Sequence, residues 1–206
     1  MNERKYSAIV FDLGNVLIPF DFDIAINKLN KFEKRLGDNF KEFYKSNYNF
    51  HRDFERGKIT EKDFINKMLE VIDNKIDADT FCRYYADIFS KNESVISLLP
   101  RLKKKYKLFL LSNTDSIHKK YGWDKYDFLN YFDGLILSFE VGSVKPEEKI
   151  YREVEKASGL SSEKHFYIDD IQEYVDAAKI IGWDAVQFQG YDKLVNDLTD
   201  RKIIRD

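Results

Sequence analysis

Hydrophobic and polar positions follow two different periods along the chain. In residues 22–36 apolar side chains recur every three or four positions with Lys and Asn between them, which predicts an amphipathic helix. The same spacing recurs in residues 40–44, 64–72 and 81–88. Residues 20–89 are therefore predicted to be helical and poor in strands.

The remaining chain alternates helices with short, wholly apolar runs. Such runs, bounded by turn residues, are typical of strands buried on both faces. We expect strands at residues 7–11, 107–111, 135–137, 165–168 and 185–188, and helices at residues 95–102, 147–158 and 174–181. Strands that alternate with helices form a parallel sheet with helices on both faces. The predicted fold class is α/β, with a Rossmann-like parallel sheet.

Local signals support several of these boundaries. Thr60, with Asp63 three residues later, resembles a helix-capping pair and predicts a helix start. Gly182 is expected to end the helix before it. Pro19 stops the regular structure that follows the first strand.

Composition excludes several classes of protein. Hydrophobic residues make up 43% of the 206 positions and charged residues 34%, which is typical of a globular protein. The net charge of −2 provides no broad field for nucleic acid or an anionic membrane, so neither is an expected partner. Cys82 is the only cysteine, so no intramolecular disulfide and no cysteine-rich zinc site can form.

The amino terminus leads us to expect a cytoplasmic protein. Residues 1–5 precede an apolar stretch without a small-residue cleavage site, and no apolar run approaches the length of a transmembrane helix. The oligomeric state, monomer or homodimer, stays open.

Acidic and polar residues stand where predicted strands end. Asp12 follows the first strand, Ser112 and Asn113 follow the second, and Asp169 and Asp170 follow the strand at residues 165–168. Open α/β folds keep their ligands at the carboxyl edge of the sheet. The same residues could instead form turns or cap the next helices. Position alone therefore leaves both interpretations open.

Four stretches in order resemble the four motifs of the haloacid dehalogenase (HAD) superfamily, most of whose members are Mg²⁺-dependent phosphatases. They are Phe11-Asp12-Leu13-Gly14-Asn15, Leu111-Ser112-Asn113-Thr114, Gly142-Ser143-Val144-Lys145-Pro146 and Ile168-Asp169-Asp170. The resemblance spans residues 9 to about 188. It implies a HAD core formed by residues 1–18 and 91–206, with residues 19–90 inserted as a helical cap.

The resemblance also assigns roles in hydrolysis of a small phosphorylated substrate. Asp12 would be the nucleophile that forms an aspartyl-phosphate. Mg²⁺ would bind the Asp12 carboxylate, the Gly14 backbone carbonyl and the Asp170 carboxylate, with Asp169 in the outer sphere or as a further ligand.

The phosphoryl group would be bound by three other residues. Lys145 would neutralise the phosphate beside Asp12 as a catalytic and phosphate-binding point charge. Ser112 and Asn113 would donate hydrogen bonds to the transferring group, although Ser-Asn-Thr is also a common helix start.

The pattern departs from the superfamily at Gly14, where most HAD phosphatases carry a second Asp as general acid and base. General acid-base catalysis typically contributes about 10²–10⁴-fold. One interpretation is a phosphatase for esters with good leaving groups, such as sugar 1-phosphates. The bacterial α-glucose-1-phosphatase-like subgroup shares this glycine and resembles the chain also at Ile117-His118.

Two alternatives remain. A 2-haloacid dehalogenase also lacks the second Asp, and a non-catalytic HAD protein could bind a phosphorylated ligand without turnover. Gly14-Asn15-Val16, where such dehalogenases have an aromatic residue followed by Gly-Thr, and the Asp169-Asp170 pair disfavour the dehalogenase. Retention of Asp12, Lys145 and Asp170 disfavours the non-catalytic protein.

Other positions have no assigned role. Tyr174 stands where the superfamily has an Asn that supports the site. For His51 and Arg52 we favour solvated helix positions over pocket positions, and the roles of His118 and His165 stay open.

Overall fold

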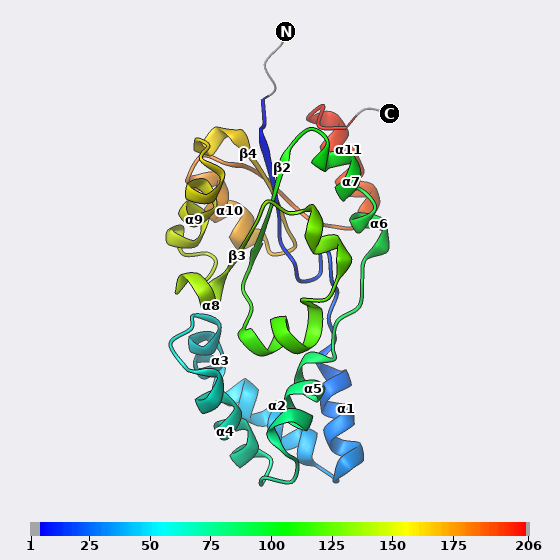
Figure 1. Ribbon diagram of the computed structural model, residues 1–206, viewed down its shortest axis with the longest axis vertical. Coiled ribbons are helices and arrows are strands. Elements are labelled where there is room, and N and C mark those ends of the chain that lie inside the picture. The colour runs from blue at the N-terminus through cyan, green and yellow to red at the C-terminus, as the bar shows by residue number, and fades with distance from the viewer. Residues whose placement is uncertain (1–4, 205–206) are drawn as a thin grey trace.

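The computed structural model describes residues 5–204 and divides visibly into a sheet-containing part and a helical part, stacked along the longest axis (Figure 1). Both described ends of the chain lie at the sheet-containing end. Residues 1–4 and 205–206 lie outside the described range. The prediction about the amino terminus rests partly on residues 1–4.

The sheet has five strands in the order β3-β2-β1-β4-β5, and all its pairings are parallel. The strands are β1 (Ala8–Phe11), β2 (Lys107–Ser112), β3 (Gly134–Leu137), β4 (His165–Asp169) and β5 (Asp184–Gln187). Each predicted strand is present within one residue at either end. The α/β, parallel-sheet prediction is confirmed.

Side chains of the central strand alternate between two buried layers. Ile9 and Phe11 belong to the core cluster that includes residues of α6 (Glu93–Ile96), α7 (Leu99–Lys103) and α11 (Tyr191–Asp200). Ala8 and Val10 belong to the opposite cluster, with α9 (Glu148–Ser158) and α10 (Gln172–Ile180). Successive strand residues point to opposite faces, so one apolar run serves both layers. Figure 1 shows α9 and α10 on one side of the sheet and α6, α7 and α11 on the other.

The helical part has its own core. Its helices are α1 (Phe22–Phe32), α2 (Leu36–Ser46), α3 (Tyr48–Glu55), α4 (Glu61–Val71) and α5 (Ala78–Ala86). Leu29, Phe40, Phe64 and Tyr85 are among the buried residues that these helices share. The Thr60 cap is confirmed, since its side chain accepts a hydrogen bond from the Asp63 backbone N–H.

The predicted helix over residues 22–36 ends early, at Phe32. Arg35 adopts a left-handed conformation, and α2 then crosses α1 at close range. A Cβ atom added at Gly37 would lie 2.1 Å from the Ile26 carbonyl oxygen. This crossing therefore requires a glycine, and hydrophobic periodicity did not reveal the break.

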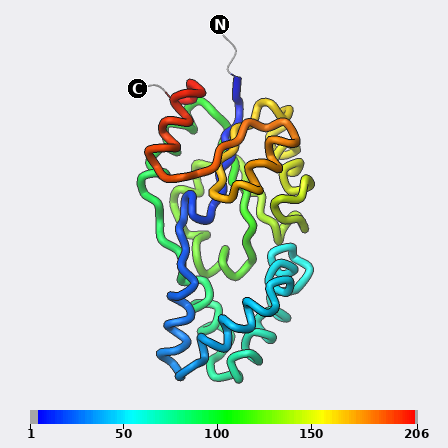
Figure 2. The backbone as a smooth tube through the Cα atoms, turned by 180° about the vertical axis from the view of Figure 1, so that it is seen from behind, coloured from blue at the N-terminus to red at the C-terminus, as the bar shows by residue number. Residues whose placement is uncertain are grey.

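The chain enters and leaves the helical part along two neighbouring segments, Phe20 and Phe89 being paired as an antiparallel bridge. The Asp21 N–H donates to the Ile88 carbonyl, and the Ser90 N–H donates to the Pro19 carbonyl. Figure 2 shows both segments from behind. The helical part is thus tied to the sheet by two hydrogen-bonded connections.

Several short elements were not predicted. After β2 the chain forms a π-helical turn, η1 (His118–Trp123), and a 3-10 helix, η2 (Asp127–Tyr131). The structure also contains α8 (Ser138–Val141) and η3 (Ser162–Lys164), and the predicted helix at 95–102 is divided into α6 and α7. Trp123 and Phe128, which belong to these two elements, are buried against the sheet core.

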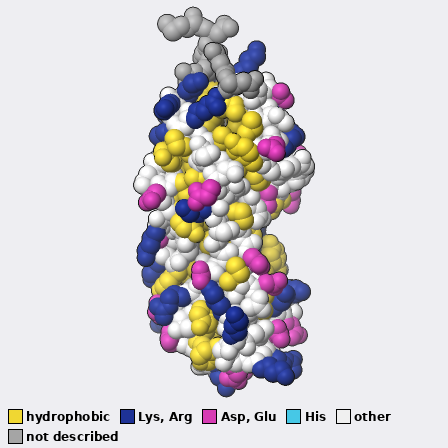
Figure 3. All heavy atoms as spheres, turned by 90° about the vertical axis from the view of Figure 1, so that its right-hand side faces the viewer, with side chains coloured by type: hydrophobic (Ala, Val, Ile, Leu, Met, Phe, Trp, Pro, Cys, Tyr) yellow, Lys and Arg dark blue, Asp and Glu magenta, His cyan; other side chains and the backbone are white. Residues whose placement is uncertain are grey.

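The surface agrees with the small net charge. On the face seen in Figure 3, acidic and basic side chains are intermingled. Among the described helices, none combines the length and apolar character that crossing a bilayer requires.

Candidate active site

The functional residues converge because β1 is the central strand. Asp12 follows β1, Ser112 ends β2 on one side, and Asp169 ends β4 on the other. The Asp12 N–H donates to the Ile168 carbonyl over 2.9 Å, which anchors it beside β4. Parallel strands place their carboxyl ends at one edge, so residues far apart in the sequence meet there.

Lys145 lies buried between two carboxylates. Its Nζ is 2.7 Å from Asp12 Oδ1 and 2.6 Å from Asp169 Oδ2. Burial alone would lower the pKa of the Lys145 ammonium, but Asp12 and Asp169 more than offset this and leave the pKa raised. The lysine is therefore a fixed positive charge beside Asp12.

The cluster carries more negative than positive charge. Burial raises the pKa of Asp12 to about 8, and Asp169 and Asp170 act in the same direction, whereas Lys145 opposes them. Burial also raises the pKa of Asp170, against the effect of a hydrogen bond from Asn15. Three carboxylates around one ammonium favour a further cation.

The donor set fits Mg²⁺, which prefers hard oxygen ligands. Carboxylate oxygens of Asp12, Asp169 and Asp170 lie within 4.8 Å of one another. Asp169, however, uses Oδ2 for Lys145 and the Tyr167 hydroxyl, and Oδ1 for the Ile171 N–H. Asp12 and Asp170 are thus the carboxylates more available to a cation.

Gly14 and its neighbours shape the other side of this cluster. The Gly14 carbonyl accepts a 2.6 Å hydrogen bond from the Val16 N–H, and a carbonyl oxygen retains a second lone pair. A Cβ atom at Gly14 would lie 3.1 Å from Phe20 Cε1. The Phe20 ring therefore crowds the position where most HAD phosphatases carry their second Asp. Asn15, at φ 54°, orients Asp170 through a 2.9 Å hydrogen bond from Nδ2 to Oδ2.

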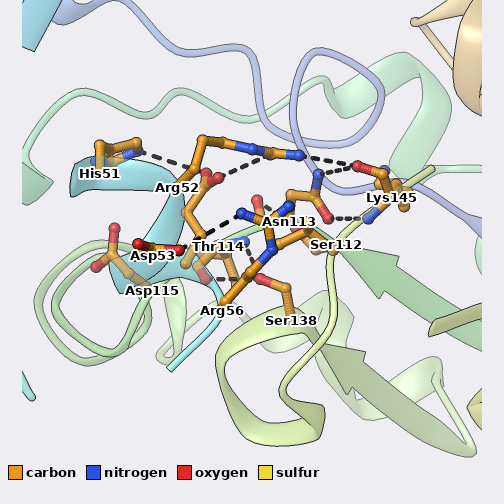
Figure 4. A network of polar contacts seen from close by, with 12 residues as sticks. His51, Arg52, Asp53, Arg56, Ser112, Asn113, Thr114, Asp115, Ser138 and Lys145 are labelled. Atoms are coloured by element: carbon orange, nitrogen blue, oxygen red, sulfur yellow. Dashed lines mark hydrogen bonds and ion pairs between the residues drawn. The ribbon is translucent and has the colours of Figure 1, made fainter. Parts of the chain in front are cut away.

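Asn113 forms a two-way hydrogen-bonded pair with the backbone of Lys145 (Figure 4). Its Oδ1 accepts from the Lys145 N–H over 2.7 Å, and its Nδ2 donates to the Lys145 carbonyl over 3.1 Å. The Ser112 hydroxyl makes one long contact, 3.3 Å to the Asn113 carbonyl, and lines the cavity. The Asn113 side chain thus orients Lys145, which sequence reasoning had not anticipated.

Tyr174, which departs from the superfamily pattern, also contacts the lysine. Its ring centroid lies 5.0 Å from Lys145 Nζ, within the range of a cation–π interaction. Its hydroxyl accepts a long hydrogen bond, 3.4 Å, from Asn113 Nδ2. A tyrosine therefore supports the site from α10, where an asparagine was the family expectation.

The helical part contributes polar residues from α3. His51 is buried and Arg52 half-buried, so the expectation of solvated positions is wrong for both. Arg52 donates to the Lys145 carbonyl over 2.9 Å (Figure 4). It also pairs with Glu55 over 2.8 Å. Burial would raise the pKa of Glu55, but His51 and Arg52 together lower it. The i,i+3 and i,i+4 spacing of these charges was the available sequence signal.

These residues enclose a cavity of about 250 Å³ between the sheet edge and the helices. Asp12, Ser112, Lys145 and Asp170 line it from the sheet side. The helical side contributes Phe22, Tyr44, Tyr48, His51, Arg52 and Glu55. His118 lines it as well, whereas His165 lies at the start of β4, at the opposite edge of the sheet. The cavity has the size of a small-molecule site.

The sheet is parallel, its carboxyl edge carries an acidic cluster bridged by a lysine, and helices cover that edge. These features together are those of an α/β hydrolase of the HAD type. The model of the haloacid dehalogenase-like hydrolase family matches residues 6–182. The chain belongs to this family.

Two of the matches come from Bacteroides thetaiotaomicron. A D-ribitol-5-phosphate phosphatase is 23% identical over 186 residues, which cover 87% of this chain and 90% of that protein. The crystal structure of a HAD family enzyme in complex with magnesium and inorganic phosphate is 25% identical, with a TM-score of 0.80, covering 92% of this chain and 98% of that chain.

The fold also matches a more distant family member. The L-2-haloacid dehalogenase of Xanthobacter autotrophicus has a TM-score of 0.64 at 16% identity, covering 97% of this chain and 85% of that chain. At this identity the likeness concerns the fold.

Proposed function

We propose that the protein is a phosphatase that hydrolyses small phosphate monoesters through an aspartyl-phosphate on Asp12. The observation that carries this proposal is the Asp12 carboxylate held by Lys145 within an acidic cluster facing the cavity. Membership of the hydrolase family and the name of the ribitol-phosphate phosphatase support the same reaction.

The reaction would proceed in two displacements. Asp12 attacks phosphorus and the P–O bond to the alcohol breaks, which leaves an aspartyl-phosphate. Water then attacks this phosphorus and releases inorganic phosphate and the free carboxylate. Lys145 holds Asp12 Oδ1 over 2.7 Å and neutralises charge on the transferring group in both displacements.

We propose Mg²⁺ as the cofactor, with the carboxylates of Asp12 and Asp170 and the carbonyl of Gly14 as ligands. When bound, the ion would supply the positive charge that phosphoryl transfer requires. Asp169 would act mainly by holding Lys145, since its oxygens are engaged by Lys145, Tyr167 and the Ile171 N–H. The relative's complex with magnesium and inorganic phosphate supports this cofactor.

Phosphate would bind between Lys145 and the carboxyl end of β2. The Ser112 hydroxyl lines the cavity there and would donate to a phosphoryl oxygen. Asn113 would contribute by positioning Lys145, because both ends of its amide contact the lysine backbone.

We propose residues 19–90 as a cap on a core formed by residues 1–18 and 91–206. Side chains join the two parts: Arg52 reaches the Lys145 carbonyl, Arg56 pairs with Glu147, and Glu61 accepts from Ser116. A cap of this kind positions the substrate and excludes water.

Because position 14 is a glycine beside the Phe20 ring, the site lacks the second Asp that usually protonates the leaving group. Sugar 1-phosphates, whose anomeric hydroxyl is a better leaving group, therefore remain a candidate class beside ordinary sugar and polyol phosphates. Phosphate release should be compared for glucose 1-phosphate, ribitol 5-phosphate and an aryl phosphate, each with Mg²⁺ and with a chelator.

Metal-dependent release that Asp12→Asn abolishes is the expected result. Mass spectrometry of enzyme quenched in acid during turnover should detect one added phosphoryl group on the peptide that contains Asp12. In H₂¹⁸O the label should enter inorganic phosphate and not the Asp12 carboxylate, because water attacks the phosphorus of the intermediate. Halide release from 2-haloacids without phosphate release would favour the dehalogenase alternative instead.

A further inference from the structure

His118 lines the cavity and carries a buried ring nitrogen without a partner in residues 5–204. The residue is 6% exposed, and its Nε2 has no hydrogen-bond partner among the residues that the structure describes. The ring lies parallel to Tyr85 at a centroid distance of 4.2 Å and edge-on to Phe89 at 5.2 Å. A buried nitrogen without a partner is costly, so Nε2 is a candidate contact for a polar group of the substrate.

The other ring nitrogen is held by Asp115. His118 Nδ1 lies 2.9 Å from Asp115 Oδ2, which also accepts from the Tyr85 hydroxyl over 3.0 Å. Asp115 Oδ1 accepts the backbone N–H groups of Ile117 and His118, each over 2.9 Å. All these contacts fix the carboxylate, so Nδ1 carries the proton toward Asp115 and Nε2 points its lone pair away from it.

The position of His118 separates it from the phosphate end of the cavity. It belongs to η1, whereas Asp12, Lys145 and Asp170 lie at the strand ends, and its ring neighbours Phe22 and Phe89 come from α1 and the returning connection. Phe22 and Phe89 line the same cavity. A substrate with its phosphate at Lys145 would therefore direct its alcohol part toward the helical side of the cavity, where the Phe22 and Phe89 rings flank His118.

A hydroxyl group fits this atom best. It donates to Nε2 when the imidazole is neutral and accepts from it when the imidazole is protonated, whereas a methylene group can do neither. A site built to bind a hydroxyl rejects the analogue that lacks it, because the buried partner is left unsatisfied.

We propose that His118, held by Asp115, is a specificity residue that binds a hydroxyl on the alcohol part of the substrate, so that the substrates are polyol or sugar phosphates. This inference rests on the proposed phosphatase function. It identifies the substrate class by a polar atom outside the four motifs.

The test uses two phosphate esters of equal carbon number, ribitol 5-phosphate and n-pentyl phosphate. The wild-type protein should prefer the hydroxylated ester. His118→Asn keeps an amide near the Nδ1 position for Asp115 but removes Nε2. Its kcat/KM for ribitol 5-phosphate should fall about 10–100-fold, the effect of one lost buried hydrogen bond, with the value for pentyl phosphate within about twofold.

Two further variants separate binding from structure. His118→Gln places an amide near the Nε2 position and should recover part of the preference that His118→Asn loses. Tyr85→Phe removes another partner of Asp115 without altering a cavity-lining residue, so it should lower the melting temperature but keep the preference.

Equal losses for both esters in His118→Asn, or no loss for either, would overturn the inference while the phosphatase activity of the wild type stood. Absence of phosphate release from both esters in the wild type, with Mg²⁺ present, would overturn the proposed function and this inference together.

Discussion

Strand β4 begins and ends with a fully buried titratable residue. The first has neutral hydrogen-bond partners, whereas the second is paired with a charged group. At the amino end, His165 places Nε2 2.9 Å from the Ser158 hydroxyl and Nδ1 3.0 Å from the Ser161 carbonyl, and its ring stacks on Trp183. Burial lowers the pKa of His165, with partial opposition from these backbone contacts. At the carboxyl end, Asp169 is paired with the Lys145 ammonium.

The difference distinguishes a structural from a functional polar cluster. The amino-edge cluster is neutral, and both ring nitrogens of His165 have partners. The carboxyl-edge cluster holds three carboxylates around one ammonium and faces a cavity. Concentrated buried charge of one sign is costly for folding, and it is typical of sites arranged for chemistry or a cation.

The largest expected effect comes from the carboxyl edge. Asp12→Asn should reduce kcat by about 10⁴-fold or more, because the nucleophile is lost. Its melting temperature should not fall, because Lys145 keeps Asp169 as its partner and the neutral amide replaces a carboxylate that burial disfavours. Phosphate release and thermal unfolding measure the two effects. Asp124→Asn, at an exposed carboxylate, is the control, and near-normal turnover by Asp12→Asn would refute the covalent route.

Lys145→Met should affect both activity and stability. Removing the ammonium leaves Asp12 and Asp169 buried without their partner, which typically costs about 3–5 kcal/mol. Denaturant unfolding measures this loss. If like charge is the cause, adding Asp12→Asn should restore part of the stability, whereas additive losses in the double variant would contradict the charge argument.

The effect of Mg²⁺ on the melting temperature should depend on the carboxyl edge of the sheet and not on the amino edge. Binding at 100 times Kd stabilises a folded protein by about 2.7 kcal/mol, so Mg²⁺ should raise the melting temperature of the wild type and a chelator should reverse the rise. Asp170→Asn should abolish the shift, while His165→Gln should retain it. An unchanged shift in Asp170→Asn would place the ion elsewhere.

The smallest effect is expected at the amino edge. His165→Gln should cost about 1–2 kcal/mol at neutral pH through lost hydrogen bonding and ring packing, with kcat unchanged. Because the folded-state pKa of His165 is lowered, the unfolded wild type binds a proton first as the pH falls below the ordinary value of 6.5. The contribution of His165 is thus present above that pH and declines as the pH falls toward the folded pKa.

The measurement is the difference in unfolding free energy between the wild type and His165→Gln. This difference should shrink between about pH 7.5 and about pH 5.5, because only the wild type has this histidine. A difference that grew on acidification would mean that His165 is charged in the folded protein, and the contrast between the two ends of β4 would be lost.

Local sequence signals determined much of the architecture. The apolar runs identified all five strands, Thr60 and Asp63 identified a helix start, and the order of the four motifs identified the family and the strand-end residues. These features depend on short stretches of chain, whose periodicity and capping chemistry can be read directly.

Only the tertiary structure decided how the site is completed. It brought Arg52 from α3 and Asn113 from the segment after β2 onto the backbone of Lys145, and it placed the Tyr174 ring over the lysine. It also put Phe20 against Gly14. Each of these contacts joins residues from different elements, and no periodicity encodes which side chains meet where a helical insertion closes over the edge of a sheet.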